Sequence, residues 1–165
     1  GYFATISAVV AKKEATAIKR GDEHPIVRWH SAGDIVDARY FKGMIGVAKA
    51  NPAVDFYAYT KQYEIVNAEL AKGTKLPKNF KVLFSHAQKG WESHIPNPFG
   101  LPTTYIDFRD KAMNVAEVSD AKAFHCPAVS RESPTSLGHE TGVTCRECRK
   151  CAHAKAGERI VFYEH

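Results

Sequence analysis

Short strand-forming runs alternate with segments of helical spacing along most of the chain, and this alternation limits the possible folds most. Apolar and β-branched residues between turn residues predict strands at 26–30, 55–59, 81–85, 103–108, 121–125 and 159–163. Apolar residues at helical spacing predict helices at 2–20, 36–50, 62–71 and 112–119. The pattern predicts an α/β fold with a largely parallel sheet, either open or closed partway into a (β/α) barrel.

The first three strands give the most specific expectation. We expect residues 26–30, 55–59 and 81–85 to form adjacent parallel strands, joined by the helices at 36–50 and 62–71. The stretch 88–102 is rich in glycine and proline and is expected to form a loop. A chain of 165 residues is the size of one ordinary domain, so we predict a single domain over residues 1–165.

Composition excludes several classes of protein. A hydrophobic fraction of 44% and a charged fraction of 25% are typical of a globular protein. Apolar runs are too short for a membrane span, and the start of the sequence does not resemble a secretory signal. The net charge of +5 favours weak attraction to polyanions, yet it is spread along the chain, so nucleic acid is not our favoured partner.

Polar or titratable residues follow most of the predicted strands. In a parallel sheet the carboxyl ends of the strands open on one side, where ligands bind in α/β folds. We therefore predict a pocket, for a small molecule or an anion, that is lined by His30, Asp34, Lys61, His86, Asp107 and Arg109. The alternative is that these residues begin ordinary polar loops.

Each residue type suggests a role in that pocket. The two histidines, His30 and His86, are suited to acid or base chemistry. Asp34 is suited to binding a hydroxyl or an amine, and Lys61 or Arg109 to holding an anion such as phosphate. The sequence names no reaction.

The four cysteines all lie in the last quarter of the chain. Cys145, Cys148 and Cys151 form a Cys-x2-Cys-x2-Cys run, and Cys126, followed by Pro127, precedes them by 19 positions. Three close cysteines and one remote Cys-Pro hold a [4Fe-4S] cluster in bacterial ferredoxins, so we predict a metal knuckle at 126–151. Zinc bound by four thiolates is the alternative. The intervening Arg146, Arg149 and Lys150 would favour thiolates, or would contact phosphate in a zinc knuckle.

Three stretches together resemble a known family. They are residues 27–34 (VRWHSAGD), residues 56–61 (FYAYTK), and the cysteine pattern followed by a strand that ends at His165. In combination, over residues 26–165, they resemble the gene-product-eighty-eight type of phage and plasmid protein, a family of unassigned function. The resemblance implies a mobile-element origin and the cytoplasm of a bacterial host.

That family is in turn similar to radical S-adenosylmethionine enzymes, which are partial (β/α) barrels with [4Fe-4S] clusters. This chain departs from their pattern, because no cysteine precedes Cys126 and the four present would leave no iron open. Two hypotheses therefore follow. The first is a phage-type [4Fe-4S] protein with a strand-end pocket, and the second is a binding module with structural zinc that contacts nucleic acid or a host protein.

Overall fold

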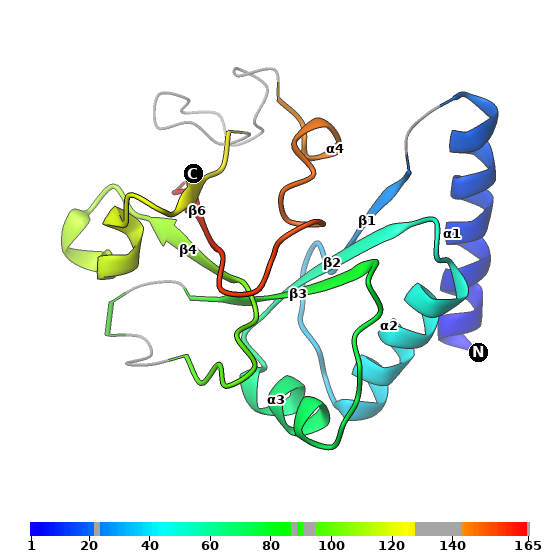
Figure 1. Ribbon diagram of the computed structural model, residues 1–165, viewed down its shortest axis with the longest axis horizontal. Helices are drawn as coiled ribbons and strands as arrows, with labels where there is room; N and C mark the ends of the chain where they lie inside the picture. The colour runs from blue at the N-terminus through cyan, green and yellow to red at the C-terminus, as the bar shows by residue number, and fades with distance from the viewer. Residues whose placement is uncertain (22–23, 87–88, 91–94, 128–142, 165) are drawn as a thin grey trace. The chain divides into compact units, whose positions relative to one another are not determined.

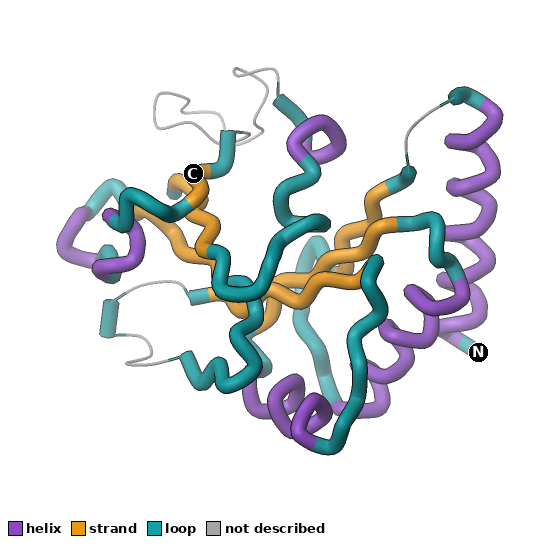
Figure 2. Tube along the Cα trace, in the orientation of Figure 1, coloured by secondary structure: helices purple, strands orange, loops and turns teal. Residues whose placement is uncertain are grey.

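A computed structural model describes the chain except for residues 22–23, 87–88, 91–94, 128–142 and 165. The described residues form the α/β fold that the sequence predicts (Figures 1 and 2). The expected loop at 88–102 falls partly outside them, as does His165 at the expected end of the last strand. They divide into two compact units, unit 1 (Gly1–Val82) and unit 2 (Leu83–His165). The single domain over residues 1–165 stays a prediction.

Among the described residues, six parallel strands form one open sheet in the order β1-β2-β3-β4-β6-β5. The strands are β1 (Ile26–Trp29), β2 (Asp55–Thr60), β3 (Phe80–Ser85), β4 (Thr103–Asp107), β5 (Phe124–His125) and β6 (Arg159–Tyr163). The first three are neighbours, as predicted. The sheet does not close, so the open form is correct and the partial barrel is not. β3 starts in unit 1 and ends in unit 2, where Phe84 and Ser85 pair with Thr103 and Thr104.

The residues of unit 1 that the structure describes form three helices, α1 (Tyr2–Lys19), α2 (Ala38–Ala50) and α3 (Tyr63–Ala71). α2 begins at Asp37, whose carboxylate accepts a hydrogen bond of 2.6 Å from the backbone N–H of Tyr40. It packs against both α1 and α3. Only glycine fits at Gly43, because a Cβ there would overlap the ring of Phe3 on α1. These contacts hold a core that includes Phe41, one of the fully buried side chains.

Asn79 joins the end of α2 to the start of β3. Its side-chain amide lies within 3.0 Å of the carbonyl oxygens of Ala48, Asn51 and Val54. The carbonyls of a last helical turn have no hydrogen-bond donor within the helix, so the Asn79 amide supplies one. The loop between α2 and β2 is thereby fixed.

Unit 2 has shorter elements, and one sequence prediction is wrong here. The helix expected at 112–119 is two 3-10 turns, η1 (Lys111–Met113) and η2 (Ala116–Ser119), separated by extended backbone at Asn114 and Val115. Its β-branched Val115 disfavours a continuous helix. The strand expected at 121–125 shrinks to Phe124–His125.

A four-residue helix, α4 (Cys145–Cys148), lies within the cysteine run. Thr144 and Glu147 form a capping box at its start, and Arg149 ends it in the left-handed conformation, with φ of 53°. The box satisfies the first backbone donors of the turn, which fixes so short a helix locally. Cys145 and Cys148 are thus three positions apart on one helical turn.

Candidate functional site

His30 directly follows β1 and has a left-handed backbone, with φ of 56°, which is uncommon for a residue other than glycine. Its Nε2 lies 3.0 Å from the Tyr40 hydroxyl, and the two rings stack with centroids 5.5 Å apart. Burial lowers the pKa of His30, and the charge of Asp34 opposes that shift. Burial, with Tyr2 nearby, raises the pKa of Tyr40 to about 12. His30 is therefore held as a neutral imidazole at pH 7.

Asp34 connects the loop after β1 to the end of β2. Its carboxylate accepts hydrogen bonds from the Ile35 N–H (2.7 Å), the Thr60 hydroxyl (2.5 Å) and the Lys61 N–H (2.9 Å). The hydroxyl that Asp34 binds is thus one of the chain's own. Asp34 and Lys61 lie together, and the contact is to the backbone of Lys61. The geometry gives Asp34 a role in holding two strand ends.

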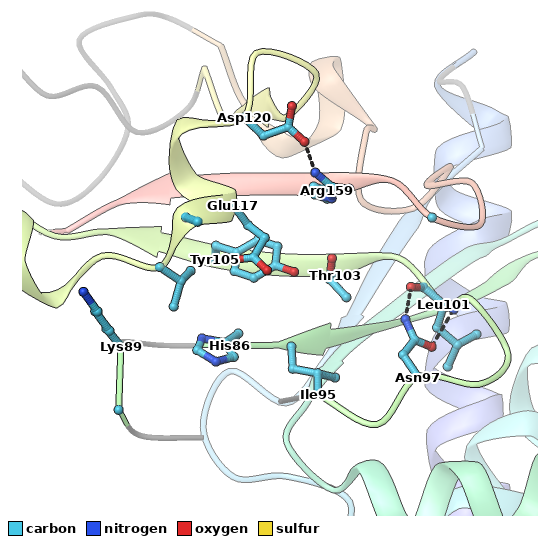
Figure 3. Close-up of a pocket in the computed structure, with 14 residues that line it drawn as sticks. His86, Lys89, Ile95, Asn97, Leu101, Thr103, Tyr105, Glu117, Asp120 and Arg159 are labelled. Carbon is cyan, nitrogen blue, oxygen red and sulfur yellow. Dashed lines mark hydrogen bonds and ion pairs between the residues drawn. The ribbon is translucent and has the colours of Figure 1, made fainter. Parts of the chain in front are cut away.

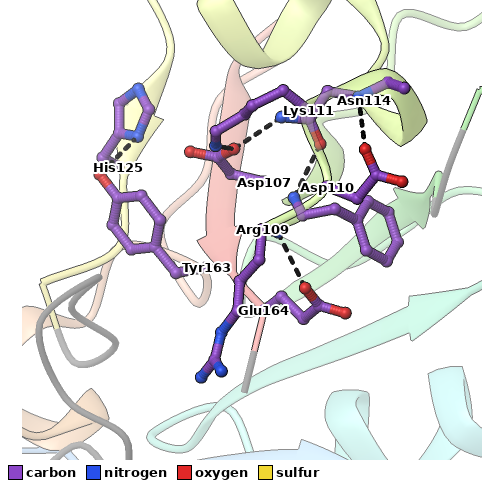
Figure 4. Close-up of polar contacts among 10 residues, drawn as sticks. Asp107, Arg109, Asp110, Lys111, Asn114, His125, Tyr163 and Glu164 are labelled. Atoms are coloured by element: carbon purple, nitrogen blue, oxygen red, sulfur yellow. Dashed lines mark hydrogen bonds and ion pairs between the residues drawn. The ribbon is translucent and has the colours of Figure 1, made fainter.

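The ends of β4 and β6 form a second polar cluster, in unit 2 (Figure 4). Asp107 is buried, pairs with the ammonium of Lys111, and accepts a 2.7 Å hydrogen bond from the Asn114 amide. The Arg109 backbone N–H donates to Glu164 over 2.8 Å, while its guanidinium points away from the other labelled side chains (Figure 4). The charge of Asp107 is therefore balanced by the ammonium of Lys111, whereas Arg109 is exposed to solvent.

The same edge of the sheet carries two residues that we did not include among the candidates. Nδ1 of His125 lies 3.2 Å from the Tyr163 hydroxyl, and their rings stack at 5.8 Å (Figure 4). The register explains the contact, because Asp107 pairs with Tyr163 and His125 pairs with Val161. Only the pairing of β5 with β6 brings these side chains to one face, and the sequence does not state that pairing.

A cavity of about 650 Å³ lies elsewhere in unit 2 (Figure 3). Of the six predicted pocket residues, only His86 lines it. His86 is buried beside the Tyr105 ring, with centroids 5.8 Å apart. The polar residues that the sequence analysis missed are Lys89, Asn97, Thr103, Tyr105, Glu117, Asp120 and Arg159. The grouping of all six predicted residues around one pocket stays a prediction.

The four cysteines are all among the described residues, and none forms a disulfide. Cys126 is buried, Cys148 and Cys151 are half-buried, and Cys145 is exposed. Within the part of the chain that the structure describes, no three or more His, Cys, Asp or Glu side chains are grouped as ligands for a metal ion. The predicted metal knuckle is therefore not shown.

Lys150 connects the cysteine run to β5. Its ammonium lies 5.2 Å from the centroid of the Phe124 ring and 2.9 Å from Oε1 of Glu158. Lys150 stands between Cys148 and Cys151, and Phe124 stands two positions before Cys126. The contact brings the segment that carries three cysteines onto the strand that precedes the fourth.

The fold is thus that of an open, parallel α/β protein with polar groups at the ends of its strands. Residues 3–154 match the family described as gene product 88. The chain belongs to the gene product 88 family. It matches none of the curated proteins and none of the solved structures with which it was compared. The likeness to radical S-adenosylmethionine enzymes therefore has no support from these comparisons. Across the described residues, no helix combines the length and apolar character of a membrane span.

Proposed function

We propose that this gene product 88 protein binds a [4Fe-4S] cluster through Cys126, Cys145, Cys148 and Cys151. The observation that carries the proposal is the contact of Lys150 with Phe124. A lysine side chain spans only a few ångströms, so the backbone between Cys148 and Cys151 must pass close to β5. All four thiols then belong to one region of unit 2.

The alternation of side chains along β5 strengthens this argument. Phe124 and Cys126 are two positions apart, and residues at that spacing point to the same face of a strand. The backbone N–H of Cys126 still donates to the Val161 carbonyl over 2.8 Å, so Cys126 continues the ladder with β6. Cys126 and the Lys150 ammonium thus share the face that Phe124 presents.

The local backbone suits a run of three ligands. The capping box fixes Cys145 and Cys148 on one helical turn, and the left-handed Arg149 then redirects the chain before Cys151. The thiols need not be preassembled, because metal binding supplies free energy that orders its own ligands. Four thiolates also match the ligands that such a cluster requires. The cluster would serve in electron transfer or would cross-link and stabilise the C-terminal region. Thiols of this kind persist in a reducing cytoplasm, and we place the protein in that of a bacterial host.

Anaerobic purification followed by metal and sulfide analysis tests the proposal. We expect about four iron and four sulfide per chain and a broad absorption band at about 400 nm. One zinc per chain in a colourless protein would replace the cluster with the structural four-thiolate zinc and favour a binding module. Neither metal at stoichiometric level would overturn a thiolate centre altogether.

Two lysine variants test the observation that carries the proposal. Lys150→Met removes both the contact with Phe124 and the ion pair with Glu158, and it should lower metal retention during gel filtration. Lys155→Met is the matched control, because Lys155 is exposed in the same segment. Equal metal retention in the two variants would show that the Lys150 contact does not position the cysteines.

A further inference from the structure

The cavity in unit 2 lies over one face of the strands and does not involve the four cysteines (Figure 3). Thr103 and Tyr105 are two positions apart on β4, and Thr103 pairs with Arg159 on β6. Residues so related share a face. η2 provides one wall, with Glu117, and the segment that includes Leu101 provides another. At about 650 Å³, the cavity has the size of a site for a small organic molecule.

Hydrogen bonds fix the framework of this cavity. The Asn97 side chain accepts from the Leu101 N–H (2.8 Å) and donates to the Leu101 carbonyl (2.7 Å). The Gly157 N–H donates to the Gly100 carbonyl over 2.8 Å, which joins that wall to the turn before β6. The cavity is therefore formed by anchored backbone as well as by side chains, as expected for a site built before its ligand arrives.

The charges of the cavity fall into two pairs of different kinds. Arg159 and Asp120 form an ion pair with each other. Lys89 and Glu117 are the other two, and neither side chain forms a hydrogen bond or ion pair with another described residue. Burial raises the pKa of Tyr105, and Glu117 adds to that shift, so the phenol stays neutral and able to donate. Among the described residues of the cavity, one cation and one anion thus remain available to a ligand.

This balance separates ligand classes. A polyanion would be attracted by Lys89 but repelled by Glu117, and a polyamine would meet the opposite conflict. A neutral sugar would desolvate both charges without pairing either one. A molecule that carries one ammonium and one carboxylate satisfies both charges at once. Ile95, Leu101 and Val115 add apolar surface for its remaining atoms.

We propose that the cavity of unit 2 binds a zwitterionic molecule of the amino-acid type, from one large amino acid to a dipeptide in size. Its carboxylate pairs with Lys89 and its ammonium with Glu117, while its side chain packs on Ile95 and Leu101. The site is independent of the proposed metal centre, since no cysteine lines it.

The test is a titration of the isotope-labelled full chain, followed by amide NMR spectra, with a panel of free L-amino acids and alanyl dipeptides. We expect at least one member to shift the resonances of residues 101–105 and 115–120 with a Kd below about 1 mM. N-acetylation of that ligand, or amidation of its carboxylate, should each weaken binding by about tenfold or more. Whichever class binds with the lower Kd, the single amino acids or the dipeptides, defines the size of the ligand.

Matched variants separate this site from the rest of the chain. Glu117→Gln and Lys89→Met should each weaken the ligand by about fivefold or more, whereas Glu64→Gln and Lys13→Met, at exposed positions of unit 1, should not. Iron and zinc content should be equal in all four variants, which distinguishes failure here from failure of the metal proposal. Three results would each overturn the inference: no binding by any panel member, equal binding of the blocked ligands, or tighter binding of ATP as a polyanion probe.

Discussion

The two units bury their polar groups and their apolar groups in different proportions. Unit 1 has long helices and holds the larger share of the buried apolar side chains among the described residues, Phe41 and Phe56 included. The described part of unit 2 has two 3-10 turns, a four-residue helix and a two-residue strand, and it contains the cavity and all four thiols. Fewer apolar side chains are buried in the described part of unit 2, and the metal centre that we propose would add to its stability.

Charged side chains of the two units also differ in their partners. In unit 1, Asp34 uses its carboxylate to hold Thr60 and Lys61, so a polar residue at a strand end serves the fold. In unit 2, the Glu117 carboxylate and the Lys89 ammonium face a cavity with no partner among the described side chains. The Asp34 carboxylate is thus bound within the fold, whereas the charged groups that line the cavity are those for which we propose a ligand.

The largest effect should follow from removing one thiolate. Cys148→Ser should release the metal and destabilise unit 2 by about 4 kcal/mol or more, because binding free energy contributes directly to folding there. Hydrogen exchange followed by mass spectrometry should show faster exchange over residues 143–163 and little change over residues 1–82. Ala116→Ser, at an exposed position, is the control. Equal protection from hydrogen exchange in the wild type and in Cys148→Ser would show that no metal centre stabilises unit 2.

Truncating a core side chain of unit 1 should destabilise unit 1 and leave metal binding in unit 2 unchanged. Phe41→Ala removes a fully buried ring and should lower the free energy of unfolding by about 4 kcal/mol. Exchange should accelerate over residues 1–82, and the metal content per folded chain should not change. Denaturant titration gives the size of the loss. Phe99→Ala, at an exposed ring, should cost far less. A loss of metal on Phe41→Ala would mean that the two units depend on each other.

Asp34→Ala tests whether the strand-end carboxylate is structural. Three donors lose their acceptor, so we expect a loss of about 2 kcal/mol of stability. Lys61→Ala keeps the backbone N–H that Asp34 binds, and it should change stability by less than about 0.5 kcal/mol. Thermal unfolding measures both. If Asp34→Ala were as stable as the wild type, Asp34 would not be a structural residue. That result would favour its predicted role in a pocket at this strand end.

The smallest effect concerns Glu69 in unit 1. This buried carboxylate lies 3.0 Å from the Lys42 ammonium and 2.8 Å from that of Lys72, and its hydrogen bonds to Lys72 and Lys42 lower its pKa to about 2. A depressed pKa stabilises the fold above the unfolded value of 4.5, and that contribution is lost as the pH falls towards 2. The lysines are mostly exposed, which limits the effect.

Acid titration of unfolding, with Glu69→Gln beside the wild type, checks this sign. The stability of the wild type should fall more steeply between pH 4.5 and 2 than that of Glu69→Gln. Glu64→Gln, at an exposed position on the same helix, should keep the slope of the wild type. Parallel curves for all three proteins would show that the Glu69 cluster makes no pH-dependent contribution.

The sequence by itself determined the α/β class, the parallel first three strands and most element boundaries, because hydrophobic periodicity and turn residues act over short distances. It misjudged 112–119, where Val115 and its extended neighbour interrupt an apparently helical pattern.

Only the tertiary structure decided which polar residues meet. The pairing of β4 with β6 brings Thr103 beside Arg159, although they are 56 positions apart in the sequence, and η2 contributes Glu117 to the same cavity. The contact of Lys150 with Phe124 likewise depends on where the segment that follows α4 lies relative to β5. No local sequence pattern predicts these contacts between distant residues, because strand order and loop closure are set by the free energy of the whole packed chain.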